Sequence, residues 1–162
     1  MRVEELMQKD VRTCGPDDTL SEAARIMWEA DCGCVPVVEP GERGRLVGII
    51  TDRDACMAAY TRGRALGELR VRDSMSRSVR VCGPQDTLVA AAGAMRAAQV
   101  RRLPVVDEAS QLLGIVSLSD IAREFTRLRA RGKKGISAIE IGELLAGICE
   151  PRQLEAGERR PR

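Results

Sequence analysis

Short apolar runs alternate along the chain with stretches in which apolar residues have helical spacing. The runs predict four buried strands, over 35–38, 46–51, 103–106 and 112–117. The spacing of Leu20, Ala23 and Met27 predicts a helix, and Thr19 with Glu22 forms a capping box at its start. Further helices are expected over about 52–61, over about 87–98 and from the last strand toward Gly132.

The same sequence pattern occurs twice. The segment Val-Arg-Thr-Cys-Gly-Pro-Asp-Asp-Thr-Leu, which begins at Val11, returns 68 residues later as Val-Arg-Val-Cys-Gly-Pro-Gln-Asp-Thr-Leu. With this offset, residues 11–39 match 79–107 at 15 of 29 positions, against about two expected from ordinary residue frequencies. A loop is then two residues shorter in the second copy, and an offset of 66 aligns Leu46–Asp54 with Leu112–Asp120. The chain therefore contains an internal duplication.

Each copy has the predicted order β-α-β-β-α, the second beginning with a short strand near Val79. Neither copy alone is long enough to bury both faces of its sheet. We expect a mixed α/β (α+β) fold in which two repeats pack sheet to sheet with pseudo-twofold symmetry, followed by a C-terminal helix. The expected divisions are 1–66 for the first repeat with its lead-in, 67–131 for the second repeat and 132–162 for the C-terminal helix and a disordered tail.

The last 30 residues contain one amphipathic segment. Its apolar positions are Ile136, Ile139, Leu144, Leu145 and Ile148. Ser137 and Glu140 are expected to cap it, and it is expected to dock on the module or on a second subunit. The Arg-rich segment from Pro151 onward is expected to be disordered.

Composition excludes several classes of function. The 26 basic and 24 acidic residues leave a net charge of +2, which gives no general attraction to nucleic acid or acidic membranes. The absence of histidine excludes Ser-His and Cys-His catalysis and histidine-ligated metals. The three aromatic residues are too few for a base-stacking platform. Outside the paired repeat positions the sequence has no clustered acid–base set, so we do not expect an enzyme.

The six cysteines and the start of the chain bear on the compartment. The charged start is unlike a signal peptide, and no apolar run approaches the ~18 residues of a membrane helix, so a cytoplasmic protein with reduced thiols is expected. Most of the cysteines are interpreted as small buried hydrophobic residues. Cys32 and Cys34 form a C-x-C pair rather than C-x-x-C, and together with Cys14 they are weak candidates for a metal or redox site.

Three features together resemble the CBS-domain pair, or Bateman module, of small stand-alone bacterial proteins. They are the tandem repeat, the strands Val-Pro-Val-Val-Glu and Leu-Pro-Val-Val-Asp, and the strand ends Gly-Ile-Ile-Thr-Asp-Arg-Asp and Gly-Ile-Val-Ser-Leu-Ser-Asp. The resemblance covers about residues 1–131. It implies a regulatory module that binds AMP, ADP, ATP, S-adenosylmethionine or sometimes NAD between the copies. It also implies a homodimer, shaped as a disc of four repeats, without catalysis of its own.

Each strand end places a hydroxyl at the start of a helix and an acid three residues later: Thr51 with Asp54, and Ser117 with Asp120. One interpretation is local, with the hydroxyls as N-caps and the acids as capping-box partners. The other is a ligand site, because a helix N-terminus suits phosphate and a carboxylate can accept hydrogen bonds from ribose hydroxyls. Both roles are compatible in one residue.

Further binding candidates come from the same comparison of the copies. Arg101 and Arg102 precede the second Pro-Val strand and are candidates for a phosphate clamp, where the first copy has Gly33 and Cys34. The two clefts are therefore expected to differ in affinity. Arg53 and Ser119 are further polar candidates. The adenine is expected against Val11, Thr13, Val35, Val79, Val81 and Leu103; family members often have Thr at the position of Val81.

Three classes of function stay open at the level of sequence. The first is a nucleotide-sensing module that acts on an unknown effector protein. The second is a ligand-free scaffold for dimerisation, for which an exposed Trp28 would be an interface anchor. The third is a thiol or metal sensor built from Cys14, Cys32 or Cys34, with Cys82 as the repeat partner of Cys14.

Overall fold

The computed structural model describes residues 1–41, 44–130 and 138–150, and it divides into two compact units. The first-repeat unit consists of Lys9–Val81 with Val106–Gly114. The second-repeat unit consists of Met1–Gln8, Cys82–Val105 and the chain from Ile115 onward. The N-terminal lead-in therefore belongs to the same unit as the second repeat.

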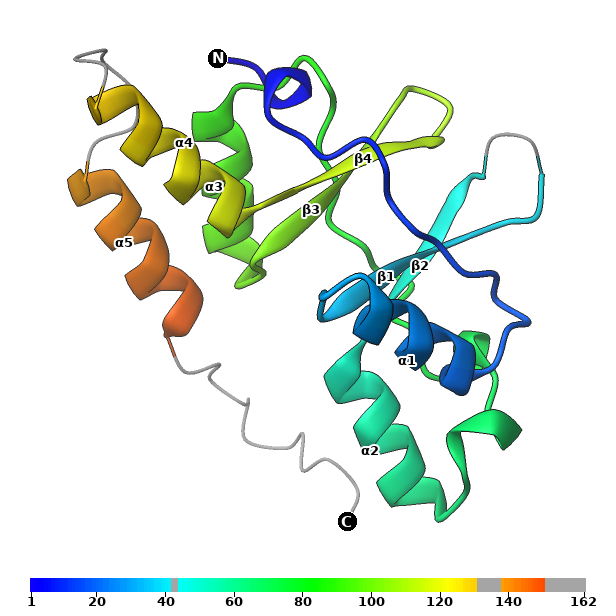
Figure 1. The fold of residues 1–162 in the computed structure, drawn as a ribbon. Helices are drawn as coiled ribbons and strands as arrows, with labels where there is room; N and C mark the ends of the chain where they lie inside the picture. Colours follow the sequence, from blue (N-terminus) through cyan, green and yellow to red (C-terminus); the bar gives the residue numbers. More distant parts are fainter. Residues whose placement is uncertain (42–43, 131–137, 151–162) are drawn as a thin grey trace. The chain divides into compact units, whose positions relative to one another are not determined.

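The first-repeat unit contains a two-stranded antiparallel sheet and two helices (Figure 1). Its elements are α1 (Leu20–Glu29), β1 (Cys34–Val38), β2 (Leu46–Thr51) and α2 (Asp52–Arg62), followed by the 3-10 turns η2 (Leu66–Glu68) and η3 (Val71–Asp73). The register pairs Val35 with Ile50 and Val37 with Gly48, and a bulge follows Val37. Thr19 caps α1 by accepting a hydrogen bond of 3.2 Å from the Glu22 N–H, as the sequence predicts.

The second-repeat unit repeats this order. Its elements are the 3-10 turn η1 (Val3–Glu5), α3 (Leu88–Ala98), β3 (Arg102–Val106), β4 (Leu112–Ser117), α4 (Leu118–Ala130) and α5 (Ala138–Cys149). Strands β3 and β4 pair with each other. Their connecting turn, with Val106 of β3 and Leu112–Gly114 of β4, falls in the first-repeat unit. The four strands expected over 35–38, 46–51, 103–106 and 112–117 and the expected helices are thus confirmed within one or two residues.

Each unit has an aliphatic core of its own. The first contains the fully buried Leu20, Val35, Val37 and Ile50, and the second contains the fully buried Met95, Leu103, Val105 and Val116. Ile50 and Val116 are repeat partners, as are Val37 and Val105. The duplication in the sequence is therefore a duplication of the packing.

The expected first strand of each repeat is wrong. It is reduced to one parallel bridge, Cys14 with Val37 and Cys82 with Val105. A Gly-Pro turn follows each of these cysteines, and proline has no N–H with which to continue a ladder.

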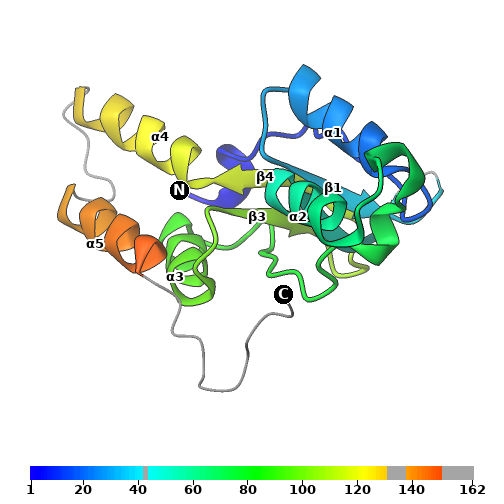
Figure 2. The same cartoon turned by 90° about the horizontal axis from the view of Figure 1, so that it is seen from below.

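Helix α5 packs against α3, which agrees with the expectation of docking on the module (Figure 2). Leu144 and Ile148 are buried in the same core as Met95, and the Gln99 side-chain amide donates a 2.8 Å hydrogen bond to the Glu150 carbonyl. The expected cap at Ser137 and the tail from Pro151 lie outside the described residues.

Candidate functional site

The start of α2 holds the first Thr-x-x-Asp pair in a closed local geometry. The Thr51 hydroxyl donates to Asp54 Oδ2 at 2.7 Å and accepts from the Asp54 N–H at 3.2 Å. The Thr51 N–H donates to the same Asp54 oxygen at 3.1 Å. The local capping interpretation is therefore confirmed for this repeat.

The start of α4 repeats this geometry with additional partners. The Ser117 N–H and hydroxyl donate to Asp120 Oδ2 at 2.9 and 2.5 Å. Asp120 Oδ1 accepts from the Gln8 side-chain amide at 3.3 Å and from the Arg123 guanidinium. Asp120 is buried, with 5% of its surface exposed, whereas Asp54 is only half-buried.

The basic and hydroxyl candidates of the second repeat lie near the same helix start. The Leu118 N–H donates to the Arg101 carbonyl at 2.8 Å, which brings Arg101 beside the first turn of α4. Ser119 lies with its hydroxyl 3.2 Å from that of Ser117, and Arg102 is the first residue of β3. In the first repeat the Asp52 N–H makes the equivalent bond of 3.3 Å to Gly33, and Arg53 is exposed.

Two pockets open on the first-repeat unit, and the repeat relates them to each other. The first, of about 200 Å³, is lined by Leu46, Val47, Arg77, Val79, Val81, Val106 and Ser110. The second, of about 130 Å³, is lined by Lys9, Val11, Thr13, Val38, Gly44, Leu112, Leu113 and Gly114. Every residue of the first pocket has its repeat partner in the second, so the same set of positions forms a pocket in both copies. The larger pocket has more apolar than polar surface, whereas the smaller pocket is mostly polar.

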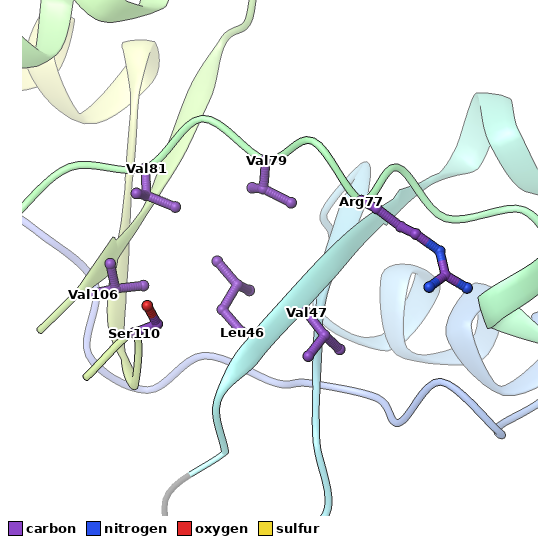
Figure 3. Close-up of a pocket in the computed structure, with 7 residues that line it drawn as sticks. All are labelled: Leu46, Val47, Arg77, Val79, Val81, Val106 and Ser110. Carbon is purple, nitrogen blue, oxygen red and sulfur yellow. The ribbon is translucent and has the colours of Figure 1, made fainter. Parts of the chain in front are cut away.

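Figure 3 shows how the side chains of the larger pocket lie. Val79, Val81, Leu46 and Val106 face a common hollow, and the Arg77 guanidinium extends away from it. The lining is aliphatic apart from Arg77 and Ser110. Such a hollow suits one face of a flat apolar ring.

The residues expected around the adenine separate into two groups. Val11 and Thr13 line one pocket, and Val79 and Val81 line the other. Val35 and Leu103 are completely buried in the two cores, so their side chains are not available to a ligand in this structure.

Sequence reasoning missed Lys9, Arg77, Gln8 and Arg123. Lys9 and Arg77 form a basic pair at the repeat offset of 68, and this signal was available in the sequence.

The cysteines do not form a reactive cluster. Burial, with the nearby negative charges of Asp18 and Glu22, raises the pKa of the Cys14 thiol to about 12. Burial and Asp86 raise the pKa of Cys82 to about 11. Over residues 1–41, 44–130 and 138–150, no group of three or more Cys, Asp or Glu side chains could hold a metal ion. This disfavours a metal site at Cys14, Cys32 and Cys34, and the raised pKa disfavours Cys14 as a reactive thiolate.

Thiol reactivity follows from these environments. We expect iodoacetamide to alkylate the exposed Cys56 and Cys149 first at pH 8, because the native Cys14 thiol would be only about 10⁻⁴ ionised at a pKa of about 12. Peptide mass spectrometry over time gives the order of modification. The denatured chain is the control, and native Cys14 reacting as fast as Cys56 would contradict this account.

Comparison with known proteins identifies similar sequences over most of the chain. The family model described as CBS domain matches residues 3–60 and 68–127. CBS domain-containing protein YhcV of Bacillus subtilis is 38% identical over 120 residues, covering 74% of this chain and 82% of its own. Other curated relatives are larger, and the chain spans 23% to 60% of the length of five of them.

Solved structures show the same fold. The CBS domain pair of protein MJ0100, in complex with 5-methylthioadenosine and S-adenosyl-L-methionine, has a TM-score of 0.68 and 28% identity, over 78% of this chain and 97% of that one. Hypoxic Response Protein I, solved with two coordinated zinc ions, has a TM-score of 0.67 and 28% identity, over 76% of this chain and 98% of that one. Hypoxic response protein 1 of Mycobacterium tuberculosis is 32% identical over 155 residues, covering 93% of this chain and 95% of its own.

Proposed function

The chain belongs to the CBS-domain family as a pair of CBS repeats, a regulatory type of module, and from that premise we propose that it senses an adenosyl nucleotide. AMP, ADP, ATP and S-adenosylmethionine are the candidate ligands. The observation that carries the proposal is the pair of repeat-related pockets, each lined by four or more aliphatic side chains together with polar groups and one basic residue. The adenosyl ligands bound by the MJ0100 pair give further support.

The proposed binding mode assigns a part of the nucleotide to each group. At about 200 and 130 Å³ the pockets are smaller than the roughly 300 Å³ that a whole ligand needs, so each would take the base. Asp54 and Asp120, with Thr51 and Ser117, would receive the ribose hydroxyls. Phosphates would meet basic and hydroxyl side chains, namely Arg53, Arg101, Arg102 and Ser119.

Thr13 and Val81 make the two pockets chemically different toward the base of a nucleotide. These residues are repeat partners and line the smaller and the larger pocket respectively. Thr13 can exchange a hydrogen bond with a base edge, whereas Val81 can offer only apolar contact. We propose that the two pockets therefore bind with unequal affinity.

A thermal-shift panel tests the sensing proposal. The purified chain is heated with each of AMP, ADP, ATP and S-adenosylmethionine at millimolar concentration, with inorganic phosphate as the control for general anion binding. A ligand at 100 times its Kd adds about 2.7 kcal/mol to the free energy of unfolding, which is several degrees for a chain of this length. No shift with any of the four ligands would reject the proposal.

A homodimer is the second part of the proposal, and the exposed aromatic residues support it. Trp28 on α1 and Tyr60 on α2 have 88% and 80% of their surfaces exposed, and α1 contacts α2 (Figure 1). Large aromatic side chains left in water are typical anchors of protein interfaces. This observation also favours the scaffold function, which differs from the sensor in needing no ligand.

Replacing Trp28 by Ser is expected to weaken self-association at least tenfold, because an interface anchor contributes about 2 kcal/mol or more. Sedimentation equilibrium measures the change. Ile139→Ser on α5, where Ile139 is 74% exposed, is the matched control. A monomeric wild-type chain, or a variant that associates as tightly as wild type, would contradict the homodimer.

The proposal also covers the cellular compartment of the protein and the division of the chain into domains. In the part of the chain that the structure describes, no helix is both long and apolar enough to cross a membrane. We propose that the chain acts in the cytoplasm on an effector protein. We also retain 1–66, 67–131 and 132–162 as the proposed divisions.

A further inference from the structure

The Asp54 and Asp120 carboxylates, at equivalent positions of the two repeats, differ in how many of their oxygens already accept hydrogen bonds. Among the described residues, only Thr51 donates to the Asp54 carboxylate, and it does so through one oxygen, Oδ2. Asp120 has the same donors on Oδ2 from Ser117, and its Oδ1 also accepts from Gln8 and Arg123. One acid therefore keeps a free oxygen, and the other has both oxygens engaged.

The internal repeat explains this difference by two substitutions. Arg123, three residues after Asp120 on α4, has Met57 as its partner at the offset of 66. Gln8 has Ser76 as its partner at the offset of 68, and both residues bridge to the equivalent strand position, Gln8 to Ile115 and Ser76 to Ile49. The first repeat therefore has an uncharged Met57 in place of the arginine and the shorter Ser76 in place of the glutamine.

We propose that Arg123 and Gln8 form a latch that closes the second-repeat acid, so that Asp54 is the acid open to the vicinal hydroxyls of a ribose. This inference rests on the proposed nucleotide-sensing function and adds to it which site fills first. A diol donates two hydrogen bonds to a carboxylate, so it needs an oxygen that is not already saturated. The chain therefore binds one nucleotide tightly, and a second binds only after the latch opens.

The latch is built to open. Arg123 has 70% of its side chain exposed, so water can replace Asp120 as the partner of the guanidinium when it swings away. The buried carboxylate, at 5% exposure, would then accept the ribose hydroxyls in place of Arg123 and Gln8. Occupation of the second site is thus graded by nucleotide concentration.

Exchange of the latch residue between the repeats tests the inference. Calorimetric titrations with ATP and with S-adenosylmethionine compare wild type, Arg123→Met and Met57→Arg, each variant carrying the residue that the other repeat has at the same place. We expect wild type to bind one equivalent tightly. Arg123→Met should gain a second equivalent, with its affinity raised roughly tenfold, a change expected for loss of one charge-assisted hydrogen bond. Met57→Arg should weaken the first equivalent by a similar factor.

The outcomes separate this inference from the function on which it rests. Two equal sites in wild type, or a single site in Arg123→Met with unchanged affinity, would overturn the latch and leave nucleotide sensing intact. Binding by none of the three proteins to either nucleotide would reject nucleotide sensing and the latch together. Circular dichroism melts establish that each variant folds before it is titrated.

Discussion

Nucleotide-dependent stabilisation is expected to fall by about half or more when Asp54 is replaced by Asn. The carboxylate accepts both ribose hydroxyls in the proposed mode, whereas an amide has one oxygen and places an N–H₂ donor against a second donor. Hydrogen bonds to a charged group contribute about 1.5–3 kcal/mol, so the affinity should fall by at least tenfold. The shift in Tm with ATP or S-adenosylmethionine measures the loss.

The controls for Asp54→Asn come from the same helix and from the other repeat. Asn keeps an oxygen for the Thr51 N–H, so the ligand-free chain should lose little stability. Asp52→Asn, on the exposed first residue of α2, should leave the nucleotide shift unchanged. Asp120→Asn should reduce the nucleotide shift by less, because Arg123 and Gln8 already donate hydrogen bonds to the Asp120 carboxylate. A full nucleotide shift in Asp54→Asn would contradict the binding mode.

The largest effect on stability is expected from Ile50→Ala. Ile50 is completely buried near the end of β2, opposite Val35, so truncation leaves a cavity in a core that has no aromatic residue among its buried side chains. Such substitutions cost about 2–5 kcal/mol. At roughly 2–4 °C per kcal/mol for a chain of this length, the Tm should fall by about 4–20 °C.

Thermal unfolding followed by circular dichroism measures the effect of Ile50→Ala. Val89→Ala is the matched control, because Val89 is 61% exposed on α3 and its truncation removes no core contact. Val116→Ala, at the repeat partner of Ile50, should also destabilise, by less, because fewer methylene groups are lost. A Tm for Ile50→Ala equal to that of Val89→Ala would mean that the first-repeat core is not packed as described.

The fold was predictable because local signals and the repeat agree. The strands and helices follow from apolar runs, helical spacing and capping residues, each of which is read within a few residues of sequence. The expected first strand of each repeat is wrong, because the Gly-Pro turn after each cysteine limits the pairing to one bridge. The packing of α5 against α3 could not be predicted, since the pattern of an amphipathic helix does not specify which surface covers its apolar face.

The site was predictable to a smaller extent. Thr51, Asp54, Ser117 and Asp120 follow from their spacing, and Arg123 could have been found as the residue three places after Asp120 on a helix. Gln8 could not, because 112 residues separate it from Asp120 and only tertiary structure brings the two together. The pockets also combine residues from both repeats, which no local pattern reveals.

In the proposed function, an adenosyl nucleotide binds at the repeat-related pockets and at the start of α2, which carries Asp54. The most direct test is a ¹H–¹⁵N correlation spectrum of the labelled chain, titrated with ATP and with S-adenosylmethionine. The account predicts saturable shifts of the amides of Thr13, Val79, Val81 and Asp54, with no shift at Ile139 on α5. Unchanged spectra at millimolar nucleotide, or saturable shifts confined to α5, would contradict it.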